Sequence, residues 1–317
     1  MSRQLGIAST EMLGQAIDRP RALARRFGNT AGSRAYDVFV PSGYEGAPLP
    51  LVVMLHGCSQ SSRDFAIGTG MDRLAEEQGF FVAYPDQPRS ANIAKSWNWF
   101  KDEHQRRDRG EPSILAGLTC EIVSEFNIDP TRVYVAGLSS GGAAAAVMAM
   151  TYPDIYAAVG IHSGLAFGSA GSMSEALSAM RRGALLRPRQ ATRSVPTIVF
   201  HGDRDTTVSP VNGEQAIAQA QPDVDLTIAT IEGRSSGGVA YTQTVLTEPG
   251  GVWSSEQWGP ARRRSRLGWR PPSRLPHRSD RSRCQSRDTT VLHVPREERR
   301  SATTLTAFLD EPDRSGS

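Results

Sequence analysis

Residues 132–150 read RVYVAGLSSGGAAAAVMAM, and this stretch decides the fold. It joins a short apolar run of strand composition to an alanine-rich run of helical composition through a Gly-x-Ser-x-Gly turn. In such a turn, called a nucleophile elbow, the serine backbone is strained, and glycines two positions to either side let strand and helix pack closely. We expect Ser139 to be a nucleophile at the helix N-terminus, where the helix dipole favours developing negative charge.

Alternating strands and helices surround this turn, which by itself could also be a glycine-serine connection without chemistry. The apolar runs LVVML (51–55) and FFVAY (80–84) are bounded by turn residues, as in strands buried on both faces. Further strands are expected over residues 35–40, 133–136, 157–161 and 197–201, and helices over 71–78, 113–126 and 140–150. This alternation predicts an α/β protein with a mostly parallel central sheet and helices on both faces, the arrangement of the α/β-hydrolase fold.

The chain divides into three segments by composition. Residues 35–258 carry the alternating pattern and form the predicted α/β-hydrolase core. The preceding residues 1–34 hold charged and small residues with one possible amphipathic helix, and we expect an N-terminal arm or lid. Residues 259–317 are rich in arginine and are expected to be a non-native, disordered tail. Within the core, residues 165–193 interrupt the alternation, which indicates an insertion over the strand ends, where insertions often shape substrate pockets.

The segment His56-Gly57-Cys58 directly follows the buried run LVVML. Hydrolases of this fold place one oxyanion-hole donor after that strand, and the other is the residue that follows the nucleophile. We therefore expect the backbone N–H groups of Cys58 and Ser140 to bind the oxygen of the tetrahedral intermediate. The alternative is that His56 and Gly57 only end a strand.

The triad acid is expected in the loop HGDRDTTV (201–208), which follows the apolar run TIVF. In this fold the triad residues occur in the chain order serine, acid, histidine. Asp205 is the preferred acid. Asp203 is its rival, since one of the two carboxylates is expected to cap or brace the turn.

The net charge of +3 hides an uneven distribution. Residues 259–317 contain fourteen arginines and seven acidic residues, a local balance of +7, so residues 1–258 carry a net charge of −4. The core has no basic stripe with interleaved aromatic residues, the pattern of a nucleic-acid site. We expect neither a nucleic-acid nor a membrane partner; a weaker alternative is that the run RRRSR (262–266) binds nucleic acid or anionic membranes.

The three cysteines, Cys58, Cys120 and Cys284, are too few and too scattered for a disulfide framework or a zinc site. We expect buried, unpaired thiols, and neither a metal nor an organic cofactor. No run approaches the roughly 18 consecutive apolar residues of a membrane helix, and residues 1–20 lack the apolar core of a signal peptide. The composition therefore indicates a soluble protein.

Seven motifs of the core resemble those of the poly(3-hydroxybutyrate) depolymerase-like esterases, a family that also includes feruloyl and acetylxylan esterases. They read LHGCSQ, GTGMDRLAEEQGF, YPDQPRSAN, SWNWF, AGLSSGG, YPDIYAAVGIHSGL and VPTIVFHGD. The resemblance implies the nucleophile and acid roles for Ser139 and Asp205, and the oxyanion role for Cys58 and Ser140.

The same resemblance implies that Trp97 and Trp99 of SWNWF line the acyl site, although both could equally be packing residues. The family often has a cysteine at the position of Ser96, where it is expected to pair with the one at Cys58. Because residue 96 is serine in this chain, that bridge cannot form.

No histidine with the expected context follows Asp205. A triad needs one to take the proton from Ser139 and to give it to the leaving alcohol, and the family supplies it in a motif resembling HGAGHAW. Family-like sequence ends at Trp258, after which only His277 and His293 remain. The base that the mechanism requires is therefore missing from its place.

A shift of reading frame accounts for this loss. The codons from Gly259 onward, read one base later, can spell V-x-H-G-A-G-H-A-W, the missing motif. We hypothesise a one-base insertion near the Trp258 codon, with the histidine codon straddling Ser265 and Arg266. The arginine-rich tail is then the out-of-frame translation of GC-rich DNA; the alternative is a genuine basic tail on a divergent enzyme.

The sequence thus predicts a serine carboxylic-ester hydrolase that acts through a Ser139 acyl-enzyme. The resemblance implies hydroxyalkanoate polyesters or oligomers, or short acyl, acetyl and feruloyl esters, as substrates. It also implies an extracellular location, with the cytoplasm as the alternative if there is no signal peptide. The rival interpretation is a pseudo-esterase that lacks its triad histidine and acts at most as a binding module.

Overall fold

The computed structural model describes residues 20–260 except residues 186–192, 223, 236–237 and 252, and these are called the described residues. The strands are β1 (Arg21–Asn29), β2 (Gly32–Val40), β3 (Leu49–Leu55), β4 (Phe81–Pro85), β5 (Ile128–Leu138), β6 (Ala158–His162), β7 (Thr197–Phe200), β8 (Thr227–Arg234), β9 (Ala240–Thr247) and β10 (Trp253–Pro260). The helices are α1 (Ser62–Thr69), α2 (Met71–Gln78), α3 (Gly110–Glu125), α4 (Ser140–Thr151), α5 (Met173–Arg182) and α6 (Val211–Ala220), with a short 3-10 helix η2 (Asp102–Gln105).

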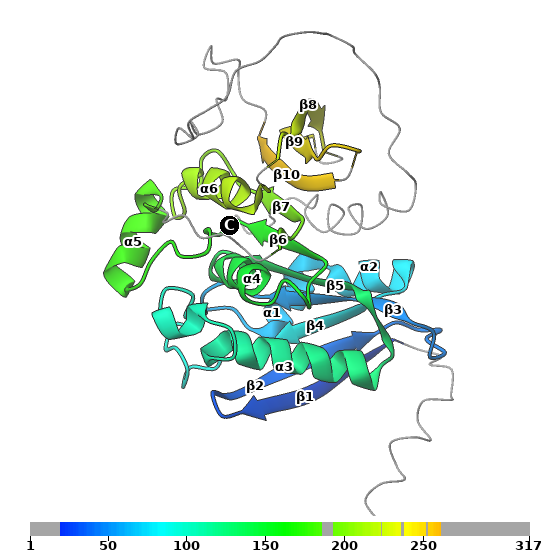
Figure 1. The fold of residues 1–317 in the computed structure, drawn as a ribbon. Coiled ribbons are helices and arrows are strands. Elements are labelled where there is room, and N and C mark those ends of the chain that lie inside the picture. The colour runs from blue at the N-terminus through cyan, green and yellow to red at the C-terminus, as the bar shows by residue number, and fades with distance from the viewer. Residues whose placement is uncertain (1–19, 186–192, 223, 236–237, 252, 261–317) are drawn as a thin grey trace, which may run out of the picture.

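The strands form one sheet in the order β1-β2-β4-β3-β5-β6-β7-β10-β9-β8. The central strands from β4 to β10 are parallel to one another, while β1 and β2 at one edge and β9 and β8 at the other are antiparallel. Helices α3, α4 and α6 pack on one face, and α1 and α2 pack on the other (Figure 1). The predicted mostly parallel sheet with helices on both faces is confirmed.

Strand β5 and helix α4 flank the decisive turn, and both are deeply buried. On β5, Val133 and Val135 join the core cluster on the α3 face, and Tyr134 and Ala136 join the cluster on the α1 face. This is the alternation expected of a strand whose successive side chains point to opposite faces. Helix α4 contacts β3, β5, β6 and α3, and its alanine side chains let its backbone lie close to these neighbours.

The sheet begins earlier in the chain than the sequence predicts. Residues 21–29, which were expected in an arm or lid, form β1 and pair with β2, and Leu23 and Phe27 pack against the main core cluster. The alternation of apolar residues in β1 is interrupted because Arg25 occupies the inward position between these two residues. Its guanidinium binds the Glu125 carboxylate at 2.7 Å. The predicted core boundary at residue 35 is therefore wrong, and residues 1–19 lie outside the described residues.

The later strands also escaped prediction. Helix α2 begins and ends where the sequence predicts, but β8, β9 and β10 were not expected. Strand β8 is exposed along almost all of its length, so it lacks the alternation of apolar residues that marks a half-buried strand. The predicted insertion over residues 165–193 contains α5, which contacts α6. The predicted tail lies outside the described residues except for its first two positions, which end β10.

Among the described residues, no helix has both the length and the apolar character needed to span a membrane.

Candidate active site

The turn after β5 holds Ser139 in a strained backbone conformation, as predicted. Its φ is 54° and its ψ is −116°, a combination that residues other than glycine rarely adopt. The Ser139 N–H donates to the His162 carbonyl on β6 at 2.8 Å, and the Ser139 carbonyl accepts the Ala143 N–H at 3.0 Å. These bonds fasten the serine to the neighbouring strand and to the first turn of α4.

Close backbone contact explains both glycines of the motif. A Cβ on Gly137 would lie 2.3 Å from the carbonyl carbon of Gly141, and a Cβ on Gly141 would lie 2.0 Å from the carbonyl oxygen of Leu55. Neither approach is possible without moving the backbone. The predicted reason for the two glycines is therefore confirmed, and the start of α4 rests directly on the end of β3.

The end of β3 brings Cys58 to the same edge of the sheet as Ser139. Leu55 pairs with Gly137 in the parallel register of β3 and β5, so the chain leaves both strands side by side. Within the described part of the chain, the Cys58 N–H donates no hydrogen bond. The N–H of Ser140, the first residue of α4, has no partner inside its own helix. One available backbone donor thus belongs to the residue after the serine, and the other lies at the same edge of the sheet.

The thiols differ from expectation. Cys58 and Cys120 are unpaired, but both are exposed, so the prediction of buried thiols is wrong for these two. The Cys58 Sγ contacts the carbonyl of Ala94, in the loop after β4, at 3.3 Å. Cys284 lies outside the described residues.

Of the two candidate acids, Asp205 is the one that the loop after β7 orients. Its Oδ1 accepts the N–H groups of Thr207 and Val208, each at 2.9 Å. The Asp205 side chain is 19% exposed, whereas Asp203 is an exposed residue. Because β7 is parallel to β5 and separated from it only by β6, the carboxylate lies on the edge that carries the serine.

Two buried histidines brace these loops, and sequence reasoning gave neither a role in the site. His201 Nε2 lies 2.8 Å from the Val208 carbonyl. His56 Nδ1 lies 2.7 Å from the Gly57 carbonyl, and its Nε2 accepts the Gln87 N–H at 3.0 Å. Burial lowers the pKa of His56, so this ring is neutral at neutral pH. A His-Gly pair follows a buried strand twice in this sequence, and that repetition was the available signal.

The two tryptophans of SWNWF are buried. Trp97 is 0% exposed, and its indole N–H donates to the His56 carbonyl at 3.0 Å. Trp99 is 6% exposed and packs edge to face against Phe100 in a cluster that includes residues of α4 and α5. These contacts are those of the packing alternative, and they place Trp97 directly behind the loop that carries Cys58.

Strand β10 ends at the same edge of the sheet as the loop that carries Asp205. Strand β10 is parallel to β7, and the His201 N–H donates to the Trp258 carbonyl at 3.1 Å. Because the carboxyl ends of parallel strands meet at one edge of a sheet, the segment after β10 begins where a triad histidine is required. Outside the described residues lie His277, His293, and the hypothesised codon position at Ser265 and Arg266.

Residues 34–239 match the family model described as esterase PHB depolymerase. Poly(3-hydroxyalkanoate) depolymerase C of Paucimonas lemoignei is 34% identical over 205 residues, which are 61% of this chain and 49% of the depolymerase. Feruloyl esterase B of Thermothelomyces thermophilus is 27% identical over 251 residues, covering 74% of this chain and 80% of the esterase. Acetylxylan esterase A of Talaromyces purpureogenus is 28% identical over 204 residues, 59% of this chain and 52% of the esterase. The chain thus spans about half the length of the first and third of these relatives.

An acetyl xylan esterase from Aspergillus awamori has a similar structure, with a TM-score of 0.59 and 21% sequence identity. The match covers 76% of this chain and 92% of that chain. At this identity the likeness bears on the fold, and it confirms the predicted α/β-hydrolase architecture.

Proposed function

We propose that this chain, which belongs to the esterase PHB depolymerase family, is a serine carboxylic-ester hydrolase with Ser139 as its nucleophile. Ser139 Oγ attacks the ester carbonyl, and the N–H groups of Cys58 and Ser140 bind the oxyanion of the tetrahedral intermediate. The alcohol leaves, and water then releases the acid from the acyl-enzyme. Asp205 orients the histidine base and stabilises its charged form.

The observation that carries this proposal is the strained backbone of Ser139 at the start of α4. Such a conformation in a residue other than glycine costs about 1–3 kcal/mol, and it persists where the surrounding structure enforces it. Here the enforcing contacts are the bond to the His162 carbonyl and the close fit of Gly141 against Leu55. Strain that is maintained next to two available N–H donors supports a catalytic role for the serine.

We further propose that the histidine base belongs to the segment after Pro260 and is missing because of a one-base frameshift near the Trp258 codon. The parallel pairing of β10 with β7 supports this location, since β10 then ends at the edge of the sheet that carries Asp205. On this proposal residues 259–317 are not the native C-terminus. The chain as it stands is then a damaged esterase, and the second candidate function is a binding module that uses the acyl site.

The substrates are proposed to be hydroxyalkanoate polyesters or oligomers, or acetyl and feruloyl esters of polysaccharides. The names of the three relatives support these classes, and each name describes that relative alone. An extracellular location is part of this proposal, because a polymer outside the cell must be cut there before its products are taken up. The chain is incubated separately with poly(3-hydroxybutyrate), an acetylated polysaccharide and a feruloylated polysaccharide. Release of 3-hydroxybutyrate, acetate or ferulate, measured by liquid chromatography, distinguishes the substrate classes.

A fluorophosphonate probe tests the nucleophile. We expect peptide mass mapping to find the phosphonyl group on Ser139 alone, with faster labelling after the downstream frame is restored, because a base then removes the hydroxyl proton. Ser139→Ala abolishes labelling, and Ser113→Ala, on the distant helix α3, leaves it unchanged. A frame-restored protein that stays unlabelled, or is labelled elsewhere, contradicts the serine mechanism.

The acid is tested by the paired substitutions Asp205→Asn and Asp203→Asn. In the frame-restored protein, we expect D205N to lower kcat by roughly 10⁴-fold, because the histidine loses its orienting carboxylate, and D203N to stay within about twofold. In the present chain D205N changes little, since there is no imidazolium to stabilise. The Asn Oδ1 still accepts the Thr207 and Val208 N–H groups, so the loop is kept.

Steady-state hydrolysis of p-nitrophenyl butyrate by each variant and by its unsubstituted parent provides the measurement. Equal losses in both variants of the frame-restored enzyme would remove Asp205 from the triad.

A further inference from the structure

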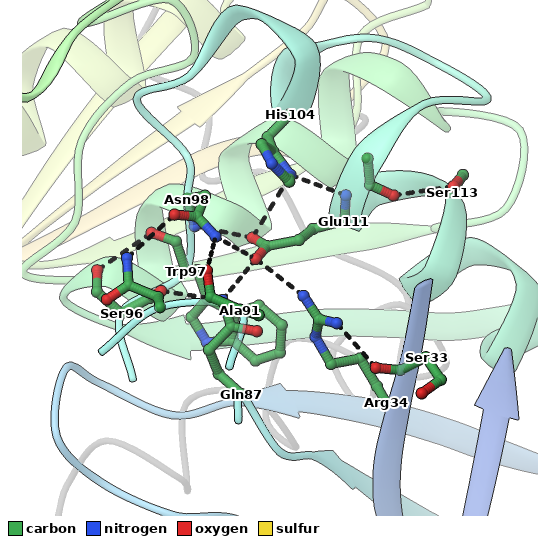
Figure 2. A network of polar contacts seen from close by, with 12 residues as sticks. Ser33, Arg34, Gln87, Ala91, Ser96, Trp97, Asn98, His104, Glu111 and Ser113 are labelled. Carbon is green, nitrogen blue, oxygen red and sulfur yellow. Dashed lines mark hydrogen bonds and ion pairs between the residues drawn. The ribbon is translucent and has the colours of Figure 1, made fainter. Parts of the chain in front are cut away.

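A buried ion pair joins Glu111 and Arg34 at the centre of a polar network (Figure 2). Glu111, in the first turn of α3, is 4% exposed, and its carboxylate binds the guanidinium of Arg34 on β2 at 3.0 Å. Arg34 is 5% exposed. Removing one partner of such a pair is strongly destabilising, because the other charge is left buried without compensation. The pair therefore fixes the start of α3 against β2.

The Glu111 carboxylate also accepts hydrogen bonds from residues of the segment that precedes α3. Oε2 accepts the Asn98 N–H at 2.8 Å, and Oε1 accepts the Asn98 side-chain amide at 2.7 Å and the side-chain amide of Gln87. The same Gln87 amide donates to the Ser96 carbonyl at 3.0 Å. Gln87 is 0% exposed. Figure 2 shows Gln87 and Asn98 converging on the carboxylate from the same loop.

From Gln87 the network continues to the oxyanion loop. The Gln87 backbone N–H donates to His56 Nε2 at 3.0 Å, so the proton of the neutral ring is on Nδ1, which donates to the Gly57 carbonyl at 2.7 Å. The indole of Trp97 holds the His56 carbonyl from the other side. Both carbonyls that precede Cys58 are thus bonded to groups whose positions depend on Gln87 and its neighbours.

No disulfide holds this loop among the described residues, since Cys58 is a free thiol. The loop is also held by two contacts with the Ala94 carbonyl, from the Ser59 N–H at 2.8 Å and from the Cys58 Sγ at 3.3 Å. Within the loop, the Gly57 N–H donates to Gln60 Oε1 at 2.7 Å. The buried network therefore supplies a fixed support on the inner side of the loop that carries the donor at Cys58.

We propose that Gln87 is a positioning residue, which couples the Arg34–Glu111 ion pair to His56 and so holds the Cys58 N–H where the oxyanion forms. This inference rests on the proposed function of the site. Oxyanion donors act mainly in the transition state, and their effect depends on a fixed position rather than on substrate binding. A displaced donor therefore lowers kcat and leaves KM nearly unchanged.

The test compares Gln87→Met with Thr119→Val in the full chain. Q87M keeps the side-chain volume and removes the amide that bridges Glu111 and the Ser96 carbonyl. T119V is the matched control: Thr119 is 0% exposed on α3, away from the site, and its hydroxyl donates to the Leu115 carbonyl at 2.7 Å. Both variants lose buried hydrogen bonds, and urea unfolding measures the stability that each one loses.

We expect Q87M to lower kcat for p-nitrophenyl butyrate by about 10- to 100-fold with KM within about twofold, while T119V keeps kcat. The assay does not require the missing base, because an oxyanion hole alone retains roughly 10³-fold catalysis over water when a triad member is absent. Equal kcat values for Q87M and T119V overturn the positioning role.

A second readout does not depend on activity. In ¹H–¹⁵N spectra, Q87M is expected to shift the amide of Cys58 and the imidazole nitrogens of His56, and T119V is expected to leave both unchanged. If the wild-type chain hydrolyses no ester above the buffer rate, the proposed function fails. The spectra alone then test whether Gln87 positions His56 and the Cys58 N–H. Unmoved Cys58 and His56 signals in Q87M overturn the positioning role in either case.

Discussion

Deleting one base near the Trp258 codon, so that the downstream frame is restored, is expected to raise kcat for p-nitrophenyl butyrate by up to about 10⁶-fold. The restored segment follows β10, which runs parallel to β7, and so brings a histidine to the edge that carries Ser139 and Asp205. A triad serine without its base retains only the contribution of the oxyanion hole and of binding. Initial rates of the present and restored chains, with Ser139→Ala in each as the blank, provide the measurement.

Equal rates in the two chains would contradict the frameshift. In that case His277 or His293 serves as the base, and residues 259–317 are a genuine C-terminus. Sequencing of the gene provides an independent check, because an intact frame across the Trp258 codon rules out the insertion directly.

Gly141→Ala is expected to prevent stable folding or to lower the free energy of unfolding by at least about 3 kcal/mol. The new Cβ would lie 2.0 Å from the Leu55 carbonyl oxygen and 2.6 Å from that of His56, and both are backbone atoms that cannot rotate away. Helix α4 and the end of β3 would have to separate, which also moves the donors beside Ser139. Urea unfolding followed by circular dichroism measures the loss.

Gly68→Ala is the matched control for this substitution. Gly68 lies in α1, and a Cβ there meets no atom within 4 Å. Alanine in a helix is favoured over glycine by roughly 0.5–1 kcal/mol, so G68A is expected to be neutral or slightly stabilising. A G141A protein as stable as G68A would mean that the close approach of α4 to β3 is not a requirement of the fold.

Local pattern was sufficient for the elements that carry the site. The strand before Ser139 and the helix after it follow from composition, and the glycines of the elbow follow from the sterics of that turn, so both were predictable. Chain order places the acid in the loop after β7 but does not separate Asp205 from Asp203, and the family resemblance implied Asp205. In the structure Asp205 accepts the N–H groups of Thr207 and Val208, and its role as the acid stays a prediction.

Side chains whose roles depend on distant partners were not predictable. Arg25 hides the alternation of β1 because its charge is balanced by Glu125, which is 100 residues away in the chain. The motif of Trp97 left an acyl-site role and a packing role open, and nothing in the sequence indicated that its indole N–H donates to the His56 carbonyl.

The sequence by itself determined the α/β-hydrolase fold, the esterase family, the place of Ser139 and the absence of a histidine in its expected context. The fold and the place of Ser139 are properties of short segments, set by periodicity and turn sterics, whereas the family follows from the resemblance of seven motifs to those of known esterases. Only the tertiary structure decided that His56, Gln87 and Glu111 form one buried network, because its bonds join β3, the loop after β4 and α3. Buried polar groups must find partners wherever the fold brings them, and spacing along the chain does not record those pairings.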